Sequence, residues 1–185
     1  MPVRLKTNNF ETVSQVAEEI KICDCKIIHK VTKDELDAFL DYLKNIAKQT
    51  DRIISVELKK NDEISQIQVF NPKSKKGRKI SLHYGEVYLL AKAINNPNTI
   101  LCDDESVIYA VDLLNGICGT NLEIQRTIKY LYSLFLSKNI SARDFREYIE
   151  KMLCGGLLSF RCPPKDMKDK SVLSIVLEFM DEIIE

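Results

Sequence analysis

The chain has 185 residues, of which 45% are apolar and 29% charged, and its formal net charge is zero. This length suits one well-buried domain, and the composition is that of an ordinary soluble globular protein. A neutral total charge excludes attraction to nucleic acid by the overall field, so any polyanion contact requires a local basic patch. The sequence has no apolar run of membrane-spanning length and no signal-peptide core, so we expect a cytoplasmic protein without membrane contacts.

In the first half of the chain, the spacing of apolar residues predicts helices over 10–20 and 33–48. Thr32, followed three residues later by Glu35, predicts a capping box at the start of the second helix. Alternating segments predict strands, at 3–5, 22–29, 53–58 and 64–70, the last two joined by a hairpin turn without glycine.

The second half alternates helices with short apolar strands. Strands are expected at 99–102 and 117–120, and Asn115-Gly116 is expected to end the helix that precedes the second of them. Helices are expected at 85–94, 105–114, 121–136, 141–153 (capped by Ser141) and 171–184. This order of elements predicts an α/β sandwich with a mostly parallel sheet.

The six cysteines include a cluster with a nearby histidine. Cys23, Cys25 and His29 could be read as half of a zinc site, but the cysteine spacing is not the usual one and no second ligand pair follows. We interpret them as half-buried side chains in a reduced protein. A Ser/Cys-His-Asp triad and a glycine-rich phosphate loop also find no support in the sequence.

Acidic residues stand where a parallel sheet usually forms its ligand site. Asp103 and Asp104 close a buried strand, and Glu35 and Glu86 fall in the first turns of helices that could bring them to the same edge. Because gathered carboxylates repel one another, a shared site needs cations or raised pKa values. Taken singly, each residue is better explained as a helix cap, and only the spacing of all of them together favours a shared site.

The segment GEVYLLAKAINNPNTILCDDESVIYAVDLLNGICGT, residues 85–120, resembles the PIN-domain nucleases. Residues 31–36 are similar to that family's second strand and its acidic-Leu pair, and the resemblance extends over residues 1–155. It implies a three-layer α/β/α sandwich over 1–155, followed by a linker and an amphipathic helix over 156–185.

The resemblance also implies a function, a metal-dependent endoribonuclease that hydrolyses RNA phosphodiesters. Mg²⁺ or Mn²⁺ would be held by the predicted catalytic carboxylates, which are Asp103, Glu86, Glu35 and Asp104. The chain departs from the family at Lys6, where an aspartate is normal. Three interpretations follow: the four acidic residues suffice, Asn8 or Asp24 takes part, or the protein is a degenerate module that binds RNA or protein.

Contacts to single-stranded or structured RNA are predicted at one basic loop. Its cationic residues are Lys73, Lys75, Lys76, Arg78 and Lys79, and the alternative is a solvated surface loop. Thr120 would orient water or phosphate as similar residues do in the family; its alternative is a hydrogen-bonded turn residue.

The last predicted helix has a broad apolar face. It suits packing on the protein's own domain, a homodimer interface or an antitoxin-like protein partner. Packing on the protein's own domain is the preferred interpretation, and the resemblance adds a partner-restrained dimer as an expectation, since small PIN-like nucleases of toxin–antitoxin pairs often work as such dimers.

Overall fold

The structure is a computed structural model that describes residues 11–20, 27–74, 77–96 and 99–154. The fold is mixed α/β, with helices and small sheets. The chain divides into two compact units, Met1–Arg126 and Thr127–Glu185. The expected boundary near residue 155 stays a prediction, because residues 155–185 lie outside the described ones. No helix in the described ranges is long and apolar enough to cross a membrane.

The largest sheet of the described residues is an antiparallel meander of β3 (Ile53–Leu58), β4 (Ile64–Phe70) and β5 (Ile80–His83). The predicted hairpin between β3 and β4 is confirmed. Its turn reverses at Asp62, which has a φ of 62°. Aspartate tolerates this left-handed conformation, so the turn forms without glycine. The third strand, β5, was not predicted from the sequence.

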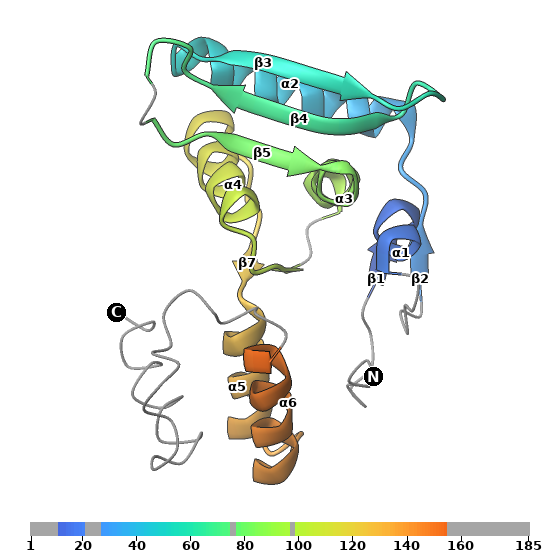
Figure 1. The fold of residues 1–185 in the computed structure, drawn as a ribbon, viewed down its shortest axis with the longest axis vertical. Helices are drawn as coiled ribbons and strands as arrows, with labels where there is room; N and C mark the ends of the chain where they lie inside the picture. Colours follow the sequence, from blue (N-terminus) through green and yellow to red (C-terminus); the bar gives the residue numbers. More distant parts are fainter. Residues whose placement is uncertain (1–10, 21–26, 75–76, 97–98, 155–185) are drawn as a thin grey trace. The chain divides into compact units, whose positions relative to one another are not determined.

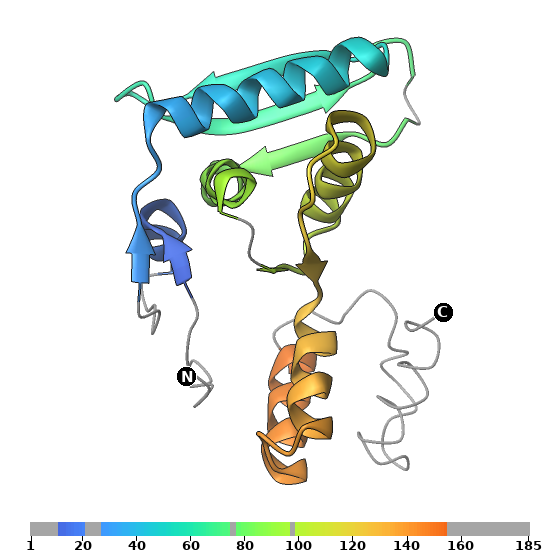
Figure 2. The same ribbon diagram turned by 180° about the vertical axis from the view of Figure 1, so that it is seen from behind.

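Helix α2 (Lys33–Gln49) lies along one face of the hairpin, as Figures 1 and 2 show from opposite sides. The predicted capping box at its start is confirmed, because Glu35 N donates to Thr32 Oγ1 at 3.2 Å and Thr32 N donates to Glu35 Oε2 at 2.8 Å. The core between helix and sheet consists of fully buried side chains, namely Phe39, Leu43, Ile46, Ile67, Val69, Ile80 and Leu82.

Two more helices complete the core of the first unit, α3 (Tyr84–Asn95) and α4 (Glu105–Cys118). Both pack against α2 and against β5. Their fully buried side chains are Val87, Leu90, Ala91, Val107, Ala110, Val111 and Leu114. Because the apolar face of each helix packs on the core, the residues at the start of each helix are held in position.

Two short parallel pairs accompany the meander. β6 (Ile100–Leu101) pairs with β7 (Ile124–Gln125), and α4 forms the crossover between them. β1 (Glu11–Val13) pairs with β2 (Ile27–His29), with α1 (Ser14–Ile20) between. These pairs and the meander form three separate sheets among the described residues. The mostly parallel central sheet therefore stays a prediction.

The N-terminal part of the expected helix over 10–20 is wrong, because residues 11–13 form β1 and the helix begins at Ser14. Thr12 and Val13 are buried, and Val13 belongs to the core that includes α3. Pairing with β2 satisfies their backbone groups where a first helical turn would leave amides open. The predicted strand at 3–5 lies outside the described residues.

The predicted end of the fourth helix and the strand expected at 117–120 are also wrong. α4 continues through Asn115-Gly116 to Cys118 and ends at Gly119, which adopts the left-handed conformation with a φ of 67°. The side chain of Asn115 binds the following loop instead: its Nδ2 donates to Leu122 O at 2.9 Å and its Oδ1 accepts from Leu122 N at 2.9 Å.

The second unit contains α5 (Thr127–Leu136) and α6 (Ala142–Cys154), which lie side by side. Stacked rings of Phe135 and Phe145, with centroids 5.1 Å apart, join them. The predicted cap at Ser141 is confirmed by a 3.1 Å hydrogen bond from Asp144 N to Ser141 Oγ. The helix expected from 121 begins only at Thr127, because β7 precedes it. The helix expected at 171–184 lies outside the described residues.

Candidate functional site

The carboxyl ends of β6 and β7 meet at one edge because the two strands are parallel. Cys102 N donates a hydrogen bond to Gln125 O at 3.1 Å, which continues the pairing one residue past β6. The segment Cys102–Asp104 and the side chain of Arg126 therefore leave the strands at the same edge. In α/β proteins such edges are the usual place for ligand sites.

The pKa of the Cys102 thiol reflects the negative charges at this edge. Burial raises the pKa of this thiol to about 11, and three negative charges add to the rise, those of Glu86, Asp104 and Asp103. A hydrogen bond from Asp104 N to the sulfur, at 3.4 Å, acts in the opposite direction. Three of the four predicted acidic residues, Glu86, Asp103 and Asp104, therefore lie within electrostatic range of the partly buried Cys102 thiol.

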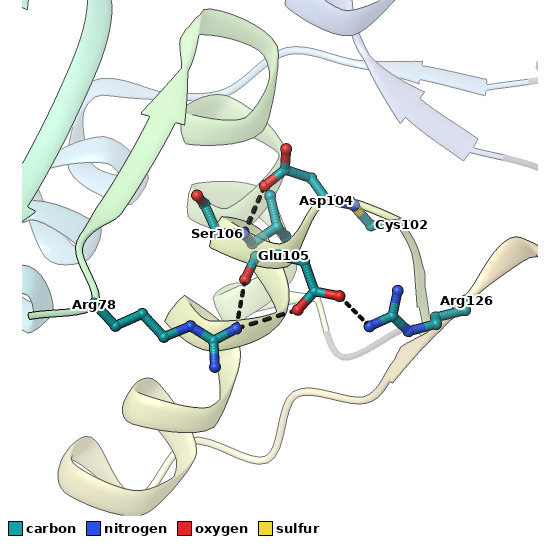
Figure 3. Close-up of polar contacts among 7 residues, drawn as sticks. Arg78, Cys102, Asp104, Glu105, Ser106 and Arg126 are labelled. Atoms are coloured by element: carbon teal, nitrogen blue, oxygen red, sulfur yellow. Dashed lines mark hydrogen bonds and ion pairs between the residues drawn. The ribbon is translucent and has the colours of Figure 1, made fainter. Parts of the chain in front are cut away.

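Helix starts hold two of these carboxylates. His83 N donates to Glu86 Oε2 at 2.7 Å in the first turn of α3. Asp104 is the N-cap of α4, and its Oδ1 accepts from Ser106 N at 2.6 Å and from Val107 N at 3.2 Å (Figure 3). The cap interpretation of Asp104 is thus confirmed. A cap fixes the position of a carboxylate without excluding a ligand role, since each carboxylate has several acceptor sites.

The fourth predicted acidic residue, Glu35, is tied to Lys92 of α3. The Nζ of Lys92 lies 2.7 Å from Glu35 Oε1. Burial by itself would raise the pKa of Glu35, but hydrogen bonds from Lys92 and from Thr32 N, together with the Lys92 charge, hold it below its ordinary value. Lys92 lies more than one helical turn beyond Glu86 on α3. The structure therefore pairs Glu35 with a cation and does not place it among the carboxylates around Cys102.

Carboxylate oxygens are the ligands that Mg²⁺ and Mn²⁺ prefer, so the chemistry of this donor set fits such an ion. Within the described part of the chain, no three His, Cys, Asp or Glu side chains form a group that could hold a metal ion. Mg²⁺ is commonly bound through one or two carboxylates with water and substrate phosphate completing its shell. The predictions for Lys6, Asn8, Asp24 and the pair Cys23 and Cys25 fall outside the described residues.

Arg78 connects the predicted basic loop to this edge. Its Nη2 donates to Glu105 Oε2 at 3.1 Å and to Glu105 O at 3.4 Å. Lys73 and Lys79 of the same loop are exposed, whereas Lys75 and Lys76 lie outside the described residues.

Thr120 lies beyond the far end of α4 from Asp104, roughly 20 Å along a helix of this length. Its Oγ1 donates to Asn115 Oδ1 at 2.8 Å, which matches the turn interpretation. The structure does not bring it to the carboxylates.

Several residues around the site were not found from the sequence: Arg52, Glu105, Tyr109 and Arg126. Arg126 directly follows β7, and the misplaced strand at 117–120 concealed that position. Arg52 and Arg78 precede β3 and β5, two strands that run in the same direction because each is antiparallel to β4. The sequence could have indicated that Arg52 and Arg78 lie at the same end of the sheet, but only if β5 had been recognised as a strand.

No protein-family model matches the chain, and the curated proteins and solved structures give no significant match either. A functional conclusion therefore depends on the geometry of this edge and on the resemblance carried by residues 85–120.

Proposed function

We propose that the protein is a metal-dependent endoribonuclease that hydrolyses RNA phosphodiesters at the carboxyl edge of β6 and β7. One observation carries the proposal: the carboxylates of Glu86, Asp103 and Asp104, from two helix starts and a strand end, all act on the Cys102 thiol. Acidic side chains near a parallel-strand edge suit a divalent cation that completes its shell with water and a substrate phosphate. The resemblance of residues 85–120 to PIN-domain nucleases supports the same activity.

The roles of the acidic residues follow from their surroundings. Asp103 lies between the strand end and the helix cap, and we assign it as the first ligand of Mg²⁺ or Mn²⁺, with Glu86 and Asp104 beside it. When bound, the ion supplies charge neutralisation at the phosphate and makes water more acidic. Backbone amides hold the carboxylates of Glu86 and Asp104 in place. These side chains would therefore lose little further conformational entropy on binding an ion.

The proposal includes a PIN-like three-layer α/β/α arrangement. It is supported by the two parallel pairs, β1–β2 and β6–β7, each with a helical crossover between its strands. Such crossovers are typical of parallel α/β folds.

Cleavage of single-stranded RNA in Mn²⁺ or Mg²⁺ tests the activity. The decisive variant is Asp103→Asn, which removes one carboxylate charge while keeping the size of the side chain. We expect cleavage to fall at least about 100-fold, as is usual when a group that stabilises the transition state is lost. Asp112→Asn is the matched control, because Asp112 is an exposed aspartate on α4. Equal cleavage by wild type and Asp103→Asn, or none by either, would refute the nuclease proposal.

The second candidate is a PIN-like module that binds RNA or protein without cutting. It is favoured by a specific observation, a group of arginines and an aromatic ring beside the carboxylates, at Arg52, Arg78, Arg126 and Tyr109. RNA binding that persists in EDTA, together with no cleavage in Mn²⁺, would select this candidate over the nuclease.

A further inference from the structure

Three arginines from distant segments meet at the first turns of α4. Arg78 and Arg126 both pair with the carboxylate of Glu105, each on a different oxygen (Figure 3). One turn later, the Tyr109 hydroxyl accepts a 2.7 Å hydrogen bond from Arg52 Nη2. We call the group of Arg52, Arg78, Arg126, Glu105 and Tyr109 the arginine cluster.

Tyr109 stiffens the cluster through contacts to two guanidinium groups. The Cζ of Arg78 lies 4.4 Å from the centre of the Tyr109 ring, and that of Arg52 lies 5.4 Å from it. A guanidinium stacked on an aromatic ring loses less freedom when it binds a further anion. Nη1 of Arg52 is buried and has no hydrogen-bond partner among the described residues. The cluster therefore contains an oriented donor that these residues do not satisfy.

The charges within the cluster do not cancel. The cluster contains three guanidiniums and one carboxylate: Arg78 and Arg126 pair with Glu105, and Arg52 bonds to the neutral Tyr109 hydroxyl, so the five residues together carry two positive charges at a partly exposed surface. Arginine is the cation best suited to phosphate, because its planar donors match two oxygens at once. The Glu105 carboxylate occupies this position as a phosphate would, with one oxygen on each arginine. Its side chain is 63% exposed, so it can turn away into solvent.

The cluster adjoins the carboxylates. Glu105 directly follows Asp104, and Arg126 leaves β7 at the edge where Asp103 leaves β6. A nucleic-acid strand that places one phosphate at the carboxylates would bring a neighbouring phosphate within reach of these arginines.

We propose that Arg78 and Arg126 bind a backbone phosphate of single-stranded RNA next to the phosphodiester that is cut. Glu105 occupies the phosphate position until RNA displaces it. Arg52 and Tyr109 hold the Arg78 guanidinium in the required orientation. This proposal rests on the proposed function for its substrate class, but RNA binding tests it without cleavage.

The experiment measures binding of fluorescein-labelled 12-nucleotide oligouridine to the full chain by fluorescence anisotropy, in EDTA and at several salt concentrations. We expect Arg78→Gln and Arg126→Gln each to weaken binding roughly tenfold, since each removes a charged hydrogen bond. Each should also reduce the slope of log affinity against log salt by about one. Lys44→Gln is the control, because Lys44 is an exposed cation on α2 that forms an exposed ion pair with Asp41. It should change affinity less than about twofold.

Glu105→Gln separates phosphate binding from a merely structural role. If Glu105 competes with RNA for the arginines, its neutral isostere should strengthen binding severalfold. If the ion pairs only support the fold, this substitution should weaken binding or leave it unchanged, and either result would overturn the proposal. It is also overturned if wild type does not bind the RNA, or if both arginine variants bind as tightly as wild type. Glu105→Gln decides the matter even if the arginine variants fail to fold.

Failure of this proposal and failure of the nuclease are distinguishable. The expected binding pattern without cleavage in Mn²⁺ would remove the nuclease and keep the phosphate site. Cleavage that depends on Asp103, with binding unaffected by the arginine substitutions, would remove the phosphate site alone.

Discussion

The Nζ of Lys92 on α3 lies 2.7 Å from Oε1 of Glu35 on α2, and the two side chains are only 20% and 16% exposed. This contact joins the start of α2 to the helix that carries Glu86. Glu35 also closes the capping box with Thr32, so one carboxylate stabilises a helix start and a helix–helix contact. The structure thus gives Glu35 a stabilising role that is separate from its predicted role as a ligand.

The first prediction concerns the stability of Glu35→Gln. Because the pKa of Glu35 in the folded protein lies below its ordinary value of 4.5, the charged form is favoured by folding. The stabilisation that the charged Glu35 side chain provides is fully present above about pH 5. It is lost as the pH falls through the pKa that Glu35 has in the folded protein. We expect the substitution to lower the free energy of unfolding by about 1–3 kcal/mol near neutral pH. The deficit should shrink below about pH 4.5.

Urea unfolding followed by circular dichroism between about pH 3 and 7 measures this deficit. Asp41→Asn provides the control, since Asp41 forms an exposed ion pair with Lys44. An exposed pair of this kind contributes less than about 1 kcal/mol. A deficit for Glu35→Gln that is the same at every pH would contradict the role of its charge.

The second prediction uses Cys102 as a reporter of the carboxylates. With a pKa of about 11, the thiol should react slowly with iodoacetamide near pH 8, because only the thiolate is nucleophilic. Asp103→Asn removes one repulsive charge and lowers that pKa, so alkylation should become faster. Millimolar Mg²⁺ should accelerate wild type in the same direction if the ion binds beside the thiol.

Peptide mass spectrometry distinguishes Cys102 from the other cysteines and gives its rate of alkylation directly. Asp112→Asn, on the exposed side of α4, should leave the rate unchanged. An unaltered rate in Asp103→Asn would show that the charge of Asp103 does not reach the thiol. No rate change with Mg²⁺ would count against an ion at this position, independently of any RNA assay.

The third prediction concerns Asn115, which fixes the loop between α4 and β7. Its side chain binds both backbone groups of Leu122 and accepts a hydrogen bond from Thr120 Oγ1. Asn115→Ala would leave partly buried polar groups without these partners, at a cost of about 2 kcal/mol in the free energy of unfolding. The exposed neighbour Asn121 gives the control, Asn121→Ala, with an expected change below about 0.5 kcal/mol. Equal stability of the two variants in thermal melts would rule out this role.

Local signals in the sequence were sufficient for several elements. The capping box of Thr32 and Glu35 and the cap at Ser141 each involve residues three positions apart, so the sequence contains both partners. The β3–β4 hairpin follows from alternating apolar residues on two adjacent segments. The end of α4 was misplaced because Asn115-Gly116 has the composition of a helix end, whereas Gly119 supplies the left-handed residue.

The acidic part of the site and Arg78 could be anticipated, and the rest of the basic part could not. Asp103 and Asp104 follow a recognisable apolar strand, so their place at a strand end was predictable. Arg52, Arg78 and Arg126 are far apart in the sequence; Arg78 belongs to the predicted basic loop, whereas Arg52 and Arg126 are ordinary surface cations when read alone. They meet only because β3 and β5 share a direction and β7 pairs with β6. Residues that meet only through tertiary structure produce no periodic pattern in a single sequence.

Helix α4 has consequences for how the protein can evolve. Its cap is Asp104, its first residue is Glu105, and Tyr109 follows one turn later. Two carboxylates and the tyrosine that contacts the arginines are thus carried by one helix, which packs on the core through Val107 and Ala110. A substitution that tilts this helix displaces the carboxylates and Tyr109 together. Their spacing should therefore survive gradual drift in the surrounding core, and it should change only when the helix itself is bent or shortened.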